Sequence, residues 1–214
     1  MNELRFQLLG FPVTIQPAFL GLLAIYLLFS LQARQPVYAL VSFCTVVFVS
    51  ILIHELGHAV VARHFQLRVD GIWLHGMGGH VLHAPGSSGQ ALAVSLAGPF
   101  AGLAFGGATF ALLPFLPPGP IMNTVVGDIL WVNIGWSIFN LLPMMPLDGG
   151  NALRSALSLR WPRVTAVRWS ATVGMLLGAG IAVLGLQYDM IFVLFIGGLS
   201  AYQNYQILQQ LPRR

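Results

Sequence analysis

Residues 37–63 carry the sequence VYALVSFCTVVFVSILIHELGHAVVAR, and this stretch decides what kind of protein the chain is. It is longer than the ~20 apolar residues that an α-helix needs to cross a bilayer. His54, Glu55 and His58 nevertheless lie inside the apolar run. A charged side chain near the middle of a spanning helix costs about 2.5–3.5 kcal/mol on insertion scales, so such residues usually serve a function. The stretch therefore predicts a membrane-spanning helix that carries a polar site.

The composition of the whole chain agrees with a membrane protein. Of its 214 residues, 57% are apolar and only 7% are charged. Soluble domains average about 25% charged residues. So few charges exclude a soluble enzyme, a nucleic-acid-binding module and a disordered chain. The single cysteine, Cys44, excludes an internal disulfide, and we expect no secretory signal peptide because Pro12 and Pro17 interrupt the start.

Six segments are long and apolar enough to be spans: residues 17–33, 37–63, 89–113, 124–142, 165–186 and 189–211. An even number of spans puts both termini on one side of the membrane. All ten basic residues are arginines, and only Arg34 then falls on the opposite side. Because basic residues accumulate in cytoplasmic loops, we expect a multi-pass protein of the cell (inner) membrane with both termini in the cytoplasm. The connections are short, so residues 1–214 are predicted to form a single membrane-embedded domain.

Two stretches outside the main spans have the alternating pattern of β-strands. Residues 4–15 alternate loosely around Gly10-Phe11-Pro12, and residues 67–82 predict a hairpin that turns at residues 76–79. Strands at a membrane surface need partners for their backbone groups, so we expect these two segments to pair. The predicted fold class is a polytopic α-helical membrane protein with about six transmembrane helices and a small membrane-associated sheet.

His54, Glu55 and His58 form an HExxH motif within the second span. Positions four apart on a helix differ by about 40° around the axis and about 6 Å along it. Both imidazoles can therefore reach one tetrahedral Zn²⁺. Glu55 lies beside them, where its carboxylate can accept a proton from the attacking water. The alternative is a hydrogen-bonded polar cluster that holds no metal.

A catalytic zinc needs a third protein ligand, and His64 is one of two candidates. It would extend the motif to HExxHxxVxxH, but Val61 stands where the chain would have to turn. Six residues of continuing helix rotate the His64 side chain by about 240° from His58, away from the metal. We therefore predict that His64 is interfacial. The same interpretation applies to His75, His80 and His83 around the hairpin, which we do not expect to be ligands.

Asp148 is the other candidate. Pro143 and Pro146 precede it, end the fourth span and are expected to hold the chain extended. The two glycines after it permit a tight turn and close backbone approach, and Asn151 is expected to cap the next helix. By topology Asp148 lies at the same cytoplasmic depth as the HExxH histidines, so we predict Asp148 as the third ligand.

The HExxH motif, together with the later loop NLLPMMPLDGG that starts at Asn140, resembles the site-2 protease family of intramembrane zinc metalloproteases. The segment SLAGP that begins at Ser95 and the Gly78-Gly79 turn are similar to that family as well. The resemblance implies the six-span type of fold and one Zn²⁺ per chain. It places the zinc ligands on His54, His58 and Asp148, the catalytic glutamate on Glu55 and the loop asparagine on Asn140. No PDZ domain and no CBS region are recognised in this sequence, so gating by such domains is not expected.

The expected function is hydrolysis of peptide bonds within or near transmembrane segments of membrane proteins, as in regulated intramembrane proteolysis. The expected partners are a transmembrane protein substrate and membrane lipids, and no nucleic acid. The Asn140 amide is placed to steady the substrate strand or the oxyanion. With Asn133 and Ser137 it forms a polar stripe that faces either the active site or a neighbouring helix. The main alternative is a polytopic metal-binding transporter or channel, against which we find no internal repeat.

Overall fold

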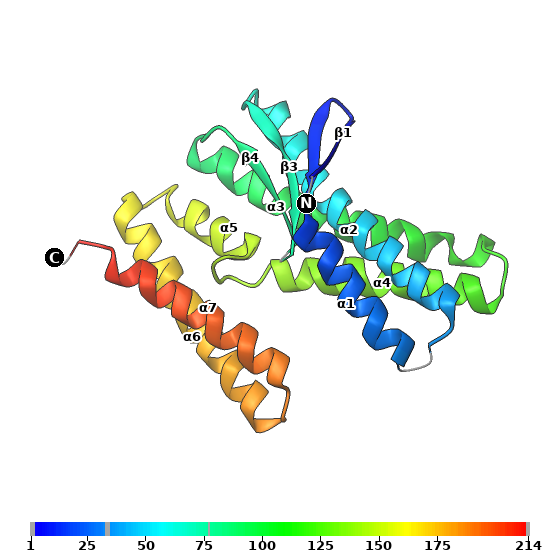
Figure 1. Ribbon diagram of the computed structural model, residues 1–214. Helices are drawn as coiled ribbons and strands as arrows, with labels where there is room; N and C mark the ends of the chain where they lie inside the picture. The colour runs from blue at the N-terminus through cyan, green and yellow to red at the C-terminus, as the bar shows by residue number, and fades with distance from the viewer. Residues whose placement is uncertain (1–2, 33–34, 77, 213–214) are drawn as a thin grey trace. The chain divides into compact units, whose positions relative to one another are not determined.

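The computed structural model describes residues 3–32, 35–76 and 78–212. Helices dominate it, with one small sheet (Figure 1). The strands are β1 (Leu4–Leu8), β2 (Phe11–Ile15), β3 (Val69–His75) and β4 (Gly78–His83). The helices are α1 (Pro17–Gln32), α2 (Val37–His64), α3 (Ser88–Leu112), the short 3₁₀ helix η1 (Leu113–Phe115), α4 (Pro120–Asn140), α5 (Asp148–Leu157), α6 (Arg163–Gln187) and α7 (Ile191–Gln209).

Five helical segments among the described residues are long and apolar enough to cross a membrane. They comprise α2, α3 with η1, α4, α6 and α7, and they match five of the six predicted spans to within a few residues. The chain is a multi-pass membrane protein. The first predicted span corresponds to α1, which has 16 residues and is therefore about 24 Å long. Residue 33, the end of that predicted span, lies outside the described residues.

The chain divides into two compact units, which we describe separately. The first comprises residues 1–85 and 97–138, and thus holds the sheet, α1, α2 and most of α3 and α4. The second comprises residues 86–96 and 139–214, and thus holds the start of α3, the end of α4 and α5 to α7.

The sheet of the first unit has the strand order β1-β2-β3-β4. Both hairpins are antiparallel, and β2 runs parallel to β3 with Val13, Thr14 and Ile15 opposite Ile72, Trp73 and Leu74. The predicted pairing of the two strand segments is confirmed. Leu9 and Gly10 form the turn of the first hairpin, with φ values of 52° and 80°. Glycine adopts such positive φ values without strain.

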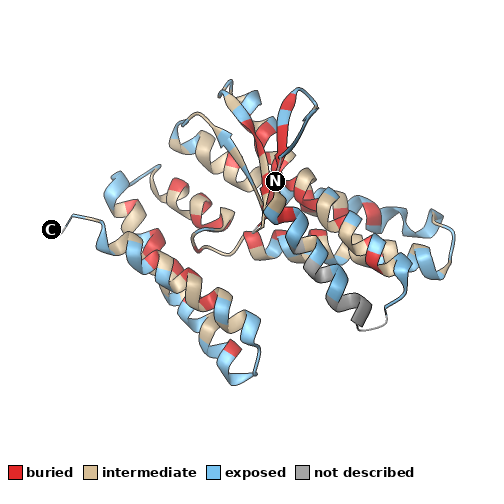
Figure 2. Cartoon of the chain, in the orientation of Figure 1, coloured by how far each residue is buried: buried red, intermediate tan, exposed pale blue. Residues whose placement is uncertain are grey.

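The core of the first unit lies between the sheet and the helices. β2 is largely buried and β3 is buried in part, whereas β1 is mostly exposed (Figure 2). The buried apolar side chains come from β2, β3, α1 and α2: Phe11, Val13, Ile15, Phe19, Ile51, Ala59, Ile72 and Leu74. This packing fixes the sheet against the part of α2 that carries the HExxH motif.

In the second unit, α6 and α7 pack as a close hairpin (Figure 1). A Cβ on Gly178 would lie 2.7 Å from the Ala201 nitrogen, and one on Gly197 would lie 2.5 Å from the Ala182 nitrogen. Small residues thus let the two backbones touch, as membrane helices often do.

Candidate metal centre

The two histidines of the HExxH motif converge on α2. His54 is 4% exposed and His58 is 7% exposed. Their Nε2 atoms lie 3.2 Å apart, with the rings at 81° to each other. Two nitrogens that bind one tetrahedral Zn²⁺ at 2.0–2.1 Å are separated by about 3.3 Å. The imidazole pair therefore has the spacing of two ligands to a single zinc ion.

Glycines bring α3 against this pair. A Cβ on Gly57 would lie 2.6 Å from the Ala97 carbonyl oxygen, so the two backbones approach closely there. A Cβ on Gly98 would lie 2.6 Å from His58 Cε1 and 2.8 Å from His54 Nε2, and it would be nearer still to His58 Nε2. Any side chain at Gly98 would therefore fill the space beside both imidazole Nε2 atoms. The residues present fit a metal ion at this point.

Glu55 points toward the sheet. It is 4% exposed, and a Cβ on Gly79 would lie 2.6 Å from its Cγ and 2.7 Å from its Oε1. Strand β4 thus crosses directly over the carboxylate, and only glycine permits this approach. The Gly78-Gly79 turn signal has its physical reason here: it brings the edge of the sheet onto the predicted catalytic base.

Asp148 lies in the first turn of α5, a helix that the loop from Leu141 to Leu147 leads into. The expectation of an extended loop is wrong. Pro143 and Pro146 lack an N–H. The chain around them turns back on itself through three backbone hydrogen bonds: Leu142 N–H donates to Phe139 O, Met144 N–H to Leu142 O and Leu147 N–H to Met144 O. The Met145–Pro146 bond is cis.

The expectation that Asn151 caps α5 is also wrong, since the cap residue is Leu147 and its carbonyl accepts from Gly150 and Asn151. Gly149 and Gly150 lie inside the helix rather than in a tight turn. The predicted close approach is confirmed, because a Cβ on Gly150 would lie 2.5 Å from the Met144 carbonyl carbon.

Among the described residues, one group of three ionisable side chains could hold a metal ion: His54, His58 and Asp148, whose ligand atoms all lie within 4.8 Å of one another. His64 is not in this group. It is the exposed last residue of α2, and its ring packs edge-on against Phe65 at 5.5 Å.

The hairpin histidines are not in the group either. The His80 ring stacks on Trp73 at 5.7 Å and lies 5.1 Å from His75. Partial desolvation, and secondarily the nearby His75, lower the pKa of His80.

The polar stripe on α4 consists of Asn133, Ser137 and Asn140, and its members have different surroundings. Asn133 is 2% exposed, and its Nδ2 donates to Ser50 Oγ of α2 at 2.9 Å, so this residue bonds helix to helix. Ser137 packs against Gly102 of α3. Asn140, 8% exposed, is the last residue of α4 and starts the loop that leads to Asp148.

Two buried polar residues of the last two helices were missed by the sequence analysis. Asn204 of α7 is 0% exposed and Ser170 of α6 is 2% exposed. Both bond backbone atoms within three residues of Asp148 in the sequence: Ser170 Oγ donates to Gly150 O at 3.1 Å and Asn204 Nδ2 donates to Met145 O at 2.9 Å. The available signal was an amide inside an apolar span, since buried polar side chains in membranes need partners.

Comparison with solved structures finds this fold in a site-2 protease from Methanocaldococcus jannaschii, with a TM-score of 0.70, 22% identity and coverage of 100% of this chain and 98% of that one. Among curated proteins, zinc metalloprotease MJ0392 of the same organism is 25% identical over 92% of this chain. The putative zinc metalloproteases Rip3 of Mycobacterium tuberculosis and sll0528 of Synechocystis are 36% and 37% identical over 64% and 50% of the chain. The chain thus has the fold of a site-2 protease and is similar in sequence to zinc metalloproteases.

No family model matches the chain. The chain spans 57% of MJ0392, 36% of Rip3 and 29% of sll0528, so these relatives extend beyond the part compared. The fold that the motifs implied is thus confirmed, and the names of the relatives agree with the stated resemblance.

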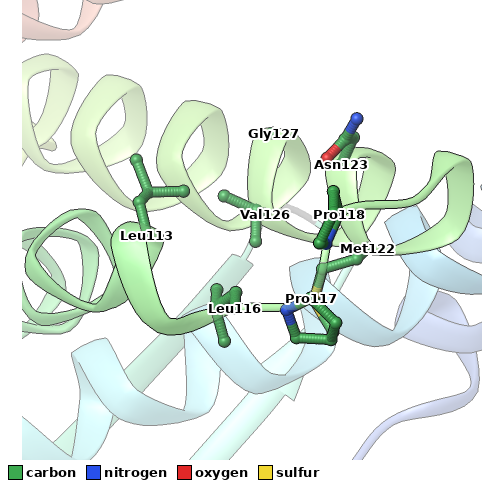
Figure 3. Close-up of a pocket in the computed structure, with 8 residues that line it drawn as sticks. All are labelled: Leu113, Leu116, Pro117, Pro118, Met122, Asn123, Val126 and Gly127. Atoms are coloured by element: carbon green, nitrogen blue, oxygen red, sulfur yellow. The ribbon is translucent and has the colours of Figure 1, made fainter.

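The described part of the chain has a cavity that none of the HExxH residues lines. It has a volume of about 360 Å³ and lies at the connection between α3 and α4 (Figure 3). Asn123 is the one polar side chain among the residues that line it, and none of these side chains is titratable. Such a lining offers no ligand for a metal and no acid or base for hydrolysis.

The packing of α3 on the histidines gives a test that leaves every ligand in place. We expect Gly98→Ala to lower zinc affinity at least ~10-fold, because the new methyl group displaces buried imidazoles that must be held in place to bind zinc. Gly107→Ala on the same helix is the matched control, since a Cβ there meets nothing within 4 Å. Zinc per chain after dialysis against a chelator measures the effect. Equal zinc retention by the two variants would contradict the packing argument.

Proposed function

We propose that this chain is an intramembrane zinc metalloprotease that hydrolyses peptide bonds within or near transmembrane segments of membrane-protein substrates. The observation that carries the proposal is the pair of imidazole nitrogens 3.2 Å apart, next to a buried glutamate in an apolar helix. The names of the zinc metalloprotease relatives support it. The alternative of a metal-binding transporter or channel finds no support in the comparisons.

The proposed zinc ligands are His54, His58 and Asp148, with one ion per chain. Three protein ligands leave a fourth position open, as in catalytic zinc sites. When bound, the ion would supply a Lewis acid that lowers the pKa of water to about 7 and polarises the scissile carbonyl. The contacts at Gly98 support this position, because a side chain there would fill the space beside the two imidazole nitrogens.

Glu55 is the proposed general base and acid. It accepts the proton of the attacking water and then delivers it to the leaving amine. Its burial under Gly79 limits access of bulk water. We assign Asn140 a part in steadying the substrate strand or the developing oxyanion through its amide N–H groups.

The substrate must be unwound before its carbonyl can be attacked, and an edge strand can hold it extended by β-augmentation. Of the two strand segments predicted from the sequence, residues 4–15 contribute the edge strand β1 and residues 67–82 contribute the edge strand β4. We propose β4 as the docking edge, because Gly79 of β4 lies against the carboxylate of Glu55. A substrate strand paired with β4 would lie beside the base.

The proposed orientation puts both termini in the cytoplasm of a cell whose inner membrane holds the protein. Arg160 and Arg163 near the start of α6 carry the argument from charge, whereas Arg34 and Arg213 lie outside the described residues. Cysteine labelling in a Cys44→Ser background is expected to place residues 5 and 160 inside and residue 118 outside. Labelling of residue 160 from the exterior would contradict the orientation.

The function itself is tested by incubating the detergent-purified protein with a library of single-span peptides. We expect zinc-dependent cleavage near or within the apolar segment of some of them, and inhibition by phenanthroline. Cleavage that survives complete metal removal would contradict the proposed chemistry, and so would metal-dependent transport of ions in vesicles without any cleavage.

A further inference from the structure

The amide side chain of Asn204 forms hydrogen bonds with the backbone of the loop that leads to Asp148. Its Nδ2 donates to the Met145 carbonyl at 2.9 Å, and its Oδ1 accepts from the Met145 N–H at 3.4 Å. Nδ2 also donates to Ser200 O within α7 at 2.7 Å. The side chain is 0% exposed, so water does not compete for these bonds.

Met145 depends on the hydrogen bonds from Asn204 more than an ordinary loop residue would. Prolines stand at positions 143 and 146, so the loop has few N–H groups with which to bond itself. A buried peptide group left without partners is costly, and Asn204 satisfies both the donor and the acceptor of one peptide residue. Three residues later the chain reaches Asp148.

A second contact holds the other side of the predicted ligand. Ser170 Oγ of α6 donates to the Gly150 carbonyl at 3.1 Å. Asp148 is thus bracketed by bonds to Met145 from α7 and to Gly150 from α6. The close glycine packing of α6 on α7 makes the two helices one support.

Gly174 of α6 sets the position of the Asn204 amide. A Cβ on Gly174 would lie 2.7 Å from Asn204 Cγ and 3.0 Å from Nδ2. The amide therefore fills the place of a side chain on α6. Any larger residue at this position would push the amide away from Met145.

We propose that Asn204 is a positioning residue for the metal centre: through Met145 it fixes the loop that presents Asp148, and thereby sets the affinity for zinc. The inference rests on the proposed function in assigning Asp148 as a ligand. Residues that orient metal ligands typically contribute 10–100-fold to metal affinity. The last two spans of the chain thus act on the metal through hydrogen bonds to the loop, without supplying a ligand.

The test uses two variants that break the hydrogen bonds between Asn204 and Met145 in different ways. Asn204→Leu keeps the volume but removes the donor and the acceptor. Gly174→Ala keeps Asn204 but displaces its amide. Gly180→Ala is the matched control on α6, since a Cβ at this position meets nothing within 4 Å. All are made in the full chain and purified in the same detergent.

Two quantities are measured: the zinc dissociation constant by competition with a chelator, and hydrogen exchange of residues 144–147 in the metal-free protein. We expect about a 10–100-fold weaker zinc affinity in Asn204→Leu and Gly174→Ala, faster exchange at Met145 and Leu147, and wild-type values in Gly180→Ala. Unchanged affinity and exchange in both variants would overturn the proposal. If Asn204→Leu does not fold, the comparison of Gly174→Ala with Gly180→Ala decides.

The two proposals fail in different ways. A wild-type protein that neither binds zinc nor cleaves peptides would refute the proposed function. Hydrogen exchange at Met145 in the metal-free protein would still report on the hydrogen bonds from Asn204. A wild-type protein that cleaves normally, beside an Asn204→Leu variant with unchanged zinc affinity, would refute only the positioning role.

Discussion

Replacing Glu55 with glutamine is expected to slow peptide cleavage by about 10⁴-fold or more while the zinc content of the protein stays unchanged. Loss of a general base typically costs 10²–10⁴-fold. Glu55 is 4% exposed, so few other groups can take the proton in its place, and the loss should reach the upper end. Glutamine keeps the shape that packs under Gly79 and removes only the ability to accept a proton.

Three measurements on one preparation separate catalysis from architecture: cleavage rate, zinc per chain and crosslinking to a transmembrane peptide. We expect the variant to bind zinc and to trap the peptide without cutting it. Glu3→Gln, the same substitution at an exposed carboxylate that pairs with Arg5, is the control and should behave as wild type. Near-normal cleavage by Glu55→Gln would refute the proposed mechanism.

The spans and the sheet could be predicted because each depends on local pattern. Long apolar runs fix where helices cross, and the turn signals at Gly10 and at residues 76–79 fix the hairpins. The pairing of the two strand segments followed from the need of surface strands for partners, whereas the parallel direction of β2 and β3 was not predicted. The first span was harder to predict than the others. Its helix α1 has 16 residues, close to the shortest length with which a helix can cross a membrane.

The loop before Asp148 could not be predicted, because its shape depends on distant residues. Prolines in sequence favour an extended chain, yet the loop coils, and Asn204, 59 residues after Met145, holds it there. The role of Gly98 was hidden for the same reason. Its spacing with Gly102 predicts helix packing in general, but only tertiary structure reveals that the contact at Gly98 is with two imidazoles.

The residues of the HExxH motif were found from sequence since their geometry is set by one helix. Four residues of helix bring His54 and His58 to one side whatever surrounds them, and this local geometry allows the observed 3.2 Å separation of their Nε2 atoms. The choice between Asp148 and His64 depended on helix phase and on topology. Their roles as ligand and non-ligand stay predictions until zinc is measured.

The last prediction concerns that choice. Removing His58 or Asp148 is expected to lower zinc affinity by more than about 100-fold, since residues that only orient ligands already contribute 10–100-fold. His64→Ala should keep wild-type zinc content and substantial activity. The reason is positional: His64 is the exposed last residue of α2 and packs on Phe65, outside the group of atoms that lie within 4.8 Å of one another.

Alanine is a suitable replacement at position 148 because it is compatible with the first turn of α5. It favours helix, and loss of a negative charge at a helix N-terminus costs only about 0.3–1 kcal/mol. A large loss of zinc from Asp148→Ala would therefore reflect the missing ligand rather than an unfolded helix, and circular dichroism checks that the helices persist. Zinc per chain is measured for wild type, His58→Ala, Asp148→Ala and His64→Ala after the same dialysis. Full occupancy in Asp148→Ala, or loss of zinc from His64→Ala equal to that from His58→Ala, would show that the third ligand is not Asp148.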